Sequence, residues 1–154
     1  MNQLKYRHLK GYKYILMQDI SIAVDLPDIE QNSANRSYAY ISVRDGILTI
    51  RKGYAWDGAS GPTWDDKTNM LASLVHDAIY QLMREGLLKS DKLHDYRRYA
   101  DAVLVAICRA NGMSRIRAWL WYQCIRIGGK KSSLKRNNPR GKVVNVNVND
   151  NFKI

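Results

Sequence analysis

Four residues whose side chains can take part in acid–base chemistry lie near the middle of the chain. His76, Asp77 and Tyr80 fall on one predicted helix, and Asp101 falls on the next. Residues three or four apart share a face of a helix, so His76 and Tyr80 are predicted to lie together at the rim of an apolar stripe. A histidine in such a place acts as a general base when a carboxylate orients its ring and water reaches it.

Asp101 is the candidate for the orienting carboxylate. It lies on a largely apolar helix face, with Arg97 and Arg98 about one turn before it. A carboxylate in such surroundings costs roughly several kcal/mol unless it is paired. We therefore expect its partner to be an arginine one turn back or a residue on the facing helix. The observation that discriminates catalysis from a structural role is whether His76 Nδ1 points to Asp101 while Nε2 faces an open pocket near Gly58; a His76 sealed under side chains would exclude catalysis.

Asp77 suggests a second role for the same helix. Its side chain diverges from that of His76 by about 100° around the helix, so the two are not expected to serve one another. A carboxylate near a glycine-rich loop suits a hard cation, because loop carbonyls around Gly58 and Gly61 would supply further oxygen ligands.

The first half of the chain predicts β-structure. Residues 20–26 alternate between apolar and polar side chains, the period of a half-buried strand. Residues 38–43 and 47–50 are β-rich and flank Asp45-Gly46, a strong hairpin signal. Residues 53–62 contain three glycines and a proline and predict an irregular, tightly turned loop.

The second half predicts helices with apolar stripes, which makes the fold class α+β: an antiparallel β-meander or hairpin followed by a three-helix core. Asp65 or Asp66 is the candidate N-cap of the first helix and Ser114 that of the third. The predicted helices span residues 65–84, 92–110 and 114–128.

Length and charge separate a domain from a tail. The 154 residues suit one domain, predicted as residues 1–129, followed by a flexible tail over 130–154 with a possible edge strand at 143–148. The net charge is +11, and residues 126–154 hold eight basic side chains against one acidic one. Such a tail attracts nucleic acid or anionic lipid headgroups, or it is simply solvated.

Cysteines and hydropathy indicate a reducing compartment. Cys108 and Cys124 lie in apolar helical patterns and are predicted to be buried free thiols. The apolar stretch at residues 14–17 is too short for a signal peptide, and no run reaches the length of a membrane span. These features predict a cytoplasmic protein.

Several motifs together resemble an uncharacterised domain family common in phages and prophages. Its pattern is a G-F/Y-x-x-D-x-A-S-x-P loop, an H-D-x-x-Y helix, an A-D helix and an R-A-x-x-x-Y helix. The resemblance covers roughly residues 41–129 and implies a phage-encoded protein in the host cytoplasm, with virion partners possible. The matching segments are residues 53–62, 74–80, 98–101 and 117–122.

The order of glycine-rich loop, H-D-x-x-Y and A-D also resembles the phospholipase A2 catalytic core. That resemblance implies a calcium-dependent esterase acting on anionic phospholipid or another ester. His76 would be the base, Asp101 its orienter, Tyr80 a hydrogen-bond partner of this dyad and Asp77 a calcium ligand. The loop carbonyls completing the calcium shell would lie near Trp56, Gly58 and Gly61.

Two departures keep other interpretations open. Asp57 and Pro62 interrupt the glycine-rich loop, and Asp57 could bind the cation itself or hold the turn by bonding loop amides. The alternative function is a non-catalytic phage accessory, virion or tail structural protein. In that case the His/Asp cluster is a buried polar network that fixes the helix pair.

Overall fold

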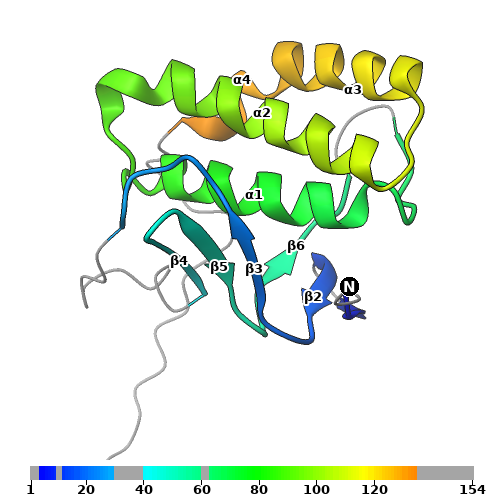
Figure 1. Cartoon of the computed structure of the whole chain (residues 1–154), viewed down its shortest axis with the longest axis horizontal. Helices are drawn as coiled ribbons and strands as arrows, with labels where there is room; N and C mark the ends of the chain where they lie inside the picture. Colours follow the sequence, from blue (N-terminus) through cyan, green and yellow to red (C-terminus); the bar gives the residue numbers. More distant parts are fainter. Residues whose placement is uncertain (1–3, 10–11, 30–39, 60–62, 135–154) are drawn as a thin grey trace, which may run out of the picture.

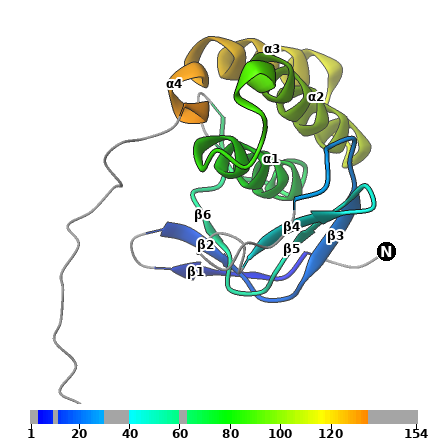
Figure 2. The same cartoon turned by 90° about the vertical axis from the view of Figure 1, so that its left-hand side faces the viewer.

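The fold consists of short antiparallel strands covered on one side by helices, the predicted α+β class. The structure is a computed structural model and describes residues 4–9, 12–29, 40–59 and 63–134. Figures 1 and 2 show α1 (Met70–Arg84) lying between the strands and the outer helices. The His76 helix is therefore the central layer of the molecule.

The strands form two three-stranded sheets, in the orders β1-β2-β6 and β3-β5-β4. All pairs within them are antiparallel. The strand bounds are β1 Tyr6–Leu9, β2 Tyr12–Leu16, β3 Ile20–Ala23, β4 Ile41–Arg44, β5 Ile47–Ile50 and β6 Ala55–Trp56.

The β4–β5 hairpin confirms the prediction made from Asp45-Gly46. Both residues have positive φ, 51° and 70°, as a two-residue hairpin turn of the type I′ class requires. The hairpin pairs Ile41 with Ile50 and Val43 with Leu48, and all four side chains are buried. Alternation along the two strands therefore supplies one apolar face to the core.

Three strand predictions differ from the structure. β3 ends at Ala23, although Val24 and Leu26 beyond it are buried, so the alternation of residues 20–26 continues as extended chain without a ladder. β1 and β2 were not predicted. β6 lies inside the segment expected to be an irregular loop, because Tyr14 and Trp56 pair across β2 and β6.

The helices occur where their apolar stripes predicted them, with one difference at the start of α1. The N-cap is Asn69, three or four residues later than expected, because Asp65 and Asp66 bind loop groups instead. Ser114 does cap α3, where its side chain accepts the Arg117 backbone N–H. The remaining helices are η2 Ser90–Lys92, α2 Leu93–Ala110, α3 Arg115–Gly128 and α4 Lys130–Ser133.

The core has two clusters that meet at α1 and α2. The larger joins both sheets to α1, and the smaller joins α2 and α3 around Leu104, Met113 and Trp121. Ile107 packs against both clusters. The helix carrying Asp101 is thereby held against α1 on one side and α3 on the other.

Several remaining predictions concern the chain ends and the thiols. α4 lies within the segment predicted as tail, and the possible strand at 143–148 falls outside the described residues. Cys108 is a buried free thiol as predicted, while Cys124 is only half-buried. In the part of the chain that the structure describes, no helix combines the length and apolarity needed to cross a bilayer.

Candidate active site

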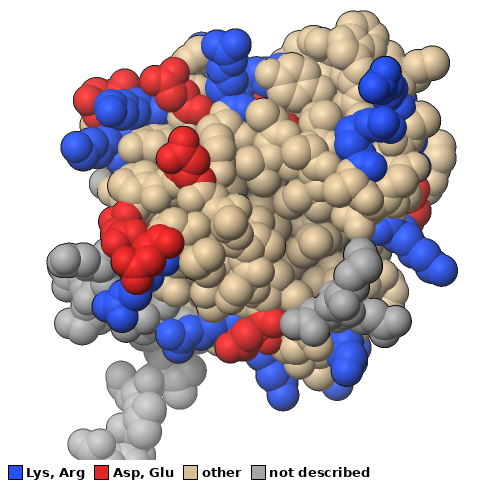
Figure 3. Space-filling view, viewed as in Figure 1, with Lys and Arg blue, Asp and Glu red and all other residues tan. Residues whose placement is uncertain are grey.

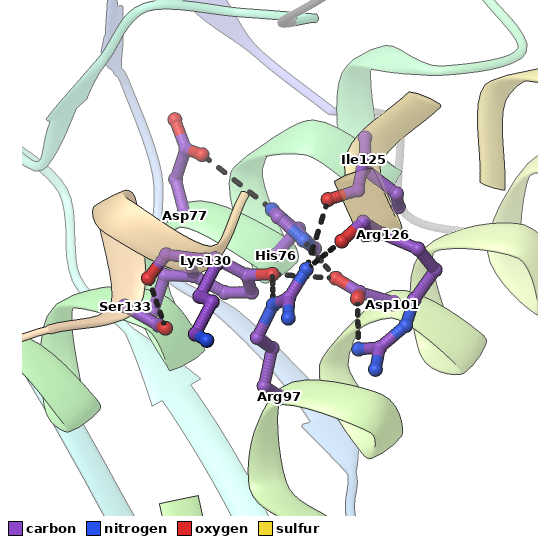
Figure 4. Close-up of polar contacts among 9 residues, drawn as sticks. His76, Asp77, Arg97, Asp101, Ile125, Arg126, Lys130 and Ser133 are labelled. Carbon is purple, nitrogen blue, oxygen red and sulfur yellow. Dashed lines mark hydrogen bonds and ion pairs between the residues drawn. The ribbon is translucent and has the colours of Figure 1, made fainter. Parts of the chain in front are cut away.

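His76 and Asp101 meet between α1 and α2, as the sequence predicted. His76 Nε2 lies 2.8 Å from Asp101 Oδ1, and the Asp101 side chain has no exposed surface (Figure 4). The contact joins two helices that pack along much of their length. The nitrogen facing Asp101 is Nε2 rather than Nδ1, because the ring enters from α1 with its far edge toward α2.

Tyr80, one helical turn after His76, completes this side of the site. Its hydroxyl donates to Asp101 Oδ1 at 2.7 Å, and its ring lies against the imidazole with centroids 4.1 Å apart. Tyr80 is 1% exposed, so the contact is shielded from water. The i, i+4 spacing therefore delivers two donors to one carboxylate oxygen.

Arg126 is the partner that sequence reasoning missed. It comes from α3, and its guanidinium Nη1 lies 2.7 Å from Asp101 Oδ2. The partner is thus on a facing helix, whereas Arg97, one turn before Asp101, donates to the Tyr80 hydroxyl at 3.3 Å and to the Ile125 and Arg126 carbonyls. No spacing along the chain signals Arg126, since only packing of the third helix brings it there.

These contacts set the protonation states of the pair. Burial alone would raise the pKa of Asp101, but donors on His76, Arg126 and Tyr80 hold that pKa below its ordinary value. Burial opposes protonation of His76, yet the carboxylates of Asp101 and Asp77 outweigh it and raise the His76 pKa. Asp101 is therefore an ionised acceptor, and neutral His76 must carry its proton on Nε2.

The other ring nitrogen is directed toward the edge of the site. His76 Nδ1 lies 3.8 Å from Asp77 Oδ1, a charge–charge distance too long for a hydrogen bond. The two side chains thus form no hydrogen bond, in line with their predicted divergence, but the Asp77 carboxylate is close enough to favour the protonated form of His76. The His76 side chain is 11% exposed and that of Asp77 28%, so the exposed surface at this edge belongs mainly to Asp77.

The glycine-rich loop is closed by Asp65, which the prediction did not include. Asp65 Oδ1 accepts the Ala59 N–H at 2.6 Å, and Oδ2 accepts the Tyr14 hydroxyl at 2.8 Å. Gly58 has a φ of 77°, and a Cβ there would stand 2.7 Å from Asp65 and from Tyr14. A glycine is required at that position by both backbone angle and space.

The residues predicted to bind a cation lie only partly within the described residues. Trp56 is buried and its indole donates to Ser73 Oγ, Asp57 is exposed, and Gly61 lies outside the described residues. In residues 4–9, 12–29, 40–59 and 63–134, no three histidine, cysteine, aspartate or glutamate side chains are gathered closely enough to hold a metal ion. Calcium binding stays a prediction.

The fold and the site together describe an α+β domain in which a His–Asp pair lies buried between two helices. The chain belongs to the family described as protein of unknown function (DUF1353), whose model matches residues 33–125. That span includes His76, Tyr80 and Asp101 and ends one residue before Arg126. No curated protein and no protein of solved structure matches the chain.

Proposed function

We propose that this protein is a hydrolase of carboxylic esters in which His76 is the general base. One observation carries the proposal: Nε2 is bound to a buried, ionised Asp101, while Nδ1 is directed to the solvent-bordering edge at Asp77. A base needs both a fixed ring and one nitrogen able to accept a proton. The family description assigns no activity, so this geometry is the support.

The proposed reaction uses the ring as a proton carrier. Neutral His76 Nδ1 takes a proton from a water molecule, and the water oxygen attacks the ester carbonyl carbon. Asp101 stabilises the resulting imidazolium through Nε2–H, and Tyr80 and Arg126 hold the carboxylate in place. When the ester C–O bond breaks, the Nδ1 proton passes to the leaving alcohol oxygen, which returns His76 to its neutral form.

No step of this reaction is assigned to a cation. The Asp77 carboxylate faces the imidazole, and the Gly58 loop is occupied by the side chain of Asp65. We propose only that the partly exposed Asp77 carboxylate binds a calcium ion, which would add positive charge beside His76. Bound there, it would lower the His76 pKa by competing with the proton.

A second function is favoured by one observation. Asp101 has no exposed surface and accepts hydrogen bonds from residues of both α1 and α3. Such a contact fixes three helices in register even if no substrate reaches it. In this alternative the chain is a phage accessory or virion protein, acting in the host cytoplasm or within the particle, and the cluster is structural.

The experiment is ester hydrolysis by the full chain, with release of acid measured on soluble esters and on anionic phospholipid vesicles, with and without calcium. His76→Gln should lower the rate by about a hundredfold or more, because a positioned base contributes about that much. His94→Gln is the matched control, since the His94 side chain on α2 is 73% exposed.

The two functions give different results in this assay. If His76→Gln keeps the wild-type rate while remaining folded, the dyad mechanism is wrong. If no ester is cleaved and His76→Gln only lowers thermal stability, the structural function is the correct one. Circular dichroism on each variant separates loss of chemistry from loss of fold.

A further inference from the structure

α3 is apolar on both of its faces. Its inner face packs Ala118, Trp121 and Ile125 into the smaller core cluster. In the described structure the outer face of α3 is open, and its exposed apolar side chains are Ile116 (75% exposed), Trp119 (59%), Leu120 (52%) and Ile127 (83%).

These four side chains lie on one side of the helix, with Gln123 between Leu120 and Ile127, and we call them the α3 outer face. Their positions differ by three, four, seven and eleven residues, the spacing of a single helical face. α3 belongs to the outer helical layer in Figures 1 and 2, on the side of α1 away from the strands, and all four side chains are exposed. Figure 3 shows an uncharged surface along α3 between basic side chains near its two ends.

The exposed charges at the two ends of this face are both positive. Arg115 is exposed at the start of α3, and Lys130 is exposed just after its end. The chain has no aspartate or glutamate between Asp101 and Asp150. Any surface that covers the α3 outer face must therefore be apolar at its centre and negative or neutral at its edge.

The exposed apolar side chains and the flanking positive charges together limit which partner can cover the α3 outer face. A second copy placed on the same face by two-fold symmetry would bring like charges of Arg115 and Lys130 into one interface. Nucleic acid would satisfy the charges but would leave three aliphatic side chains without an apolar partner. An anionic bilayer satisfies both, since acyl chains bury Ile and Leu, headgroups pair with Arg and Lys, and Trp prefers the interface.

We propose that the α3 outer face docks the protein on an anionic lipid surface. α3 lies in the plane of the interface, with Ile116, Leu120 and Ile127 among the acyl chains and Trp119 at headgroup level. Arg115 and Lys130 contact lipid phosphates. This docking face is distinct from the His76 edge and does not rest on the proposed hydrolysis.

The test is flotation of the full chain with vesicles of phosphatidylcholine alone or mixed with phosphatidylglycerol. The wild type should float with the anionic vesicles, and the bound fraction should fall as salt is added. Ile116→Gln together with Ile127→Gln should weaken binding roughly tenfold or more, because two large apolar groups lose their burial. Ile47→Gln is the matched control, since Ile47 is 41% exposed on β5, away from α3.

Three results would overturn the proposal. The first is no binding of the wild type to anionic vesicles, and the second is equal binding by the double variant and the wild type. The third is a wild-type dimer in analytical ultracentrifugation that the double variant loses, which would assign the face to a second copy. Both positions are exposed, so the variants should keep the wild-type circular dichroism spectrum and thermal midpoint.

Discussion

At Asp101 a carboxylate with no exposed surface accepts hydrogen bonds from His76, Tyr80 and Arg126. His76 and Tyr80 donate to Oδ1 and Arg126 donates to Oδ2, so both oxygens are used and the charge is compensated. Burying such a charge without these partners would cost roughly several kcal/mol. The same contacts that keep Asp101 ionised also fix the imidazole ring, which links the stability of the fold to the proposed chemistry.

The first prediction concerns this carboxylate. Asp101→Asn should lower the free energy of unfolding by about 3 kcal/mol, because it removes the buried charge that accepts hydrogen bonds from His76, Tyr80 and the partly buried Arg126. Chemical denaturation measures this. Asp95→Asn on the same helix is the control, since the Asp95 side chain is 79% exposed and its loss should leave stability unchanged. A loss for Asp101→Asn no larger than that of the control contradicts the account.

The second prediction concerns the proton on His76. Its pKa should lie above the ordinary 6.5, and Asp77→Asn should lower it by removing one of the two nearby carboxylates. Because the pKa is raised on folding, its stabilising contribution is complete below the unfolded pKa and is lost as pH rises through the folded value. An NMR titration of the ring protons measures the shift, with Asp95→Asn as control. If the His76 pKa does not fall in Asp77→Asn, the Asp77 carboxylate does not affect the protonation of His76, which contradicts the account.

At the scale of elements, the glycine-rich loop is positioned by a side chain rather than by its own glycines alone. Asp65 binds the loop through the Ala59 N–H and binds β2 through the Tyr14 hydroxyl. Burial, with the Asp65 contact, raises the pKa of Tyr14 to about 12, so that hydroxyl remains a donor. Asp65 thus connects the glycine-rich loop to β2, in the segment that leads into α1.

The third prediction separates backbone strain from crowding in this loop. Gly58 and Gly86 both have positive φ, but a Cβ would meet Asp65 and Tyr14 only at Gly58. Gly86→Ala should cost about 1 kcal/mol of stability from the backbone angle alone. Gly58→Ala should cost about 3 kcal/mol, because overpacking adds to the strain. Equal losses in thermal or chemical denaturation would mean that the close approach at Gly58 is not maintained.

At the scale of the whole molecule, the two core clusters are not independent. α1 packs on both sheets and on α2, α2 packs on α3, and Ile107 touches both clusters. The Asp101 contacts cross the same boundary, since Arg126 comes from α3 and Tyr80 from α1. Loss of one cluster would expose apolar surface of the other.

The fourth prediction is a single cooperative unfolding transition. Trp56 lies in the larger cluster and Trp121 in the smaller, so tryptophan fluorescence reports on both. Thermal midpoints from fluorescence and from far-UV circular dichroism should coincide, as they do for one cooperative unit. Two separated transitions would show that the helices α2 and α3 unfold apart from the sheets.

Local signals in the sequence were sufficient for much of this fold. Asp45-Gly46 predicted its hairpin because positive φ at both residues is a property of the turn itself. The helices followed from their apolar stripes. β6 could not be predicted in the same way, because two residues have no periodicity and their strand exists only through pairing with β2.

The candidate site, too, could be predicted only where local sequence signals were present. His76, Tyr80 and Asp101 were predicted, since helical spacing places the first two together and burial demands a partner for the third. Arg126 and Asp65 were missed as site residues, because both act through contacts between elements far apart in the chain. The orientation of the imidazole could not be predicted, since ring rotation depends on packing rather than on sequence spacing, and the structure has Nε2 rather than Nδ1 toward Asp101.

The most direct measurement is the tautomer of His76 by long-range proton–nitrogen NMR on labelled protein, above the pKa of the ring. The account predicts a proton on Nε2, donated to Asp101, and an unprotonated Nδ1 able to accept a proton from water. Asp101→Asn should disturb that preference, while Asp95→Asn should leave it intact. A neutral ring with its proton on Nδ1 would contradict the account, since His76 would then have no free base at the edge that borders solvent.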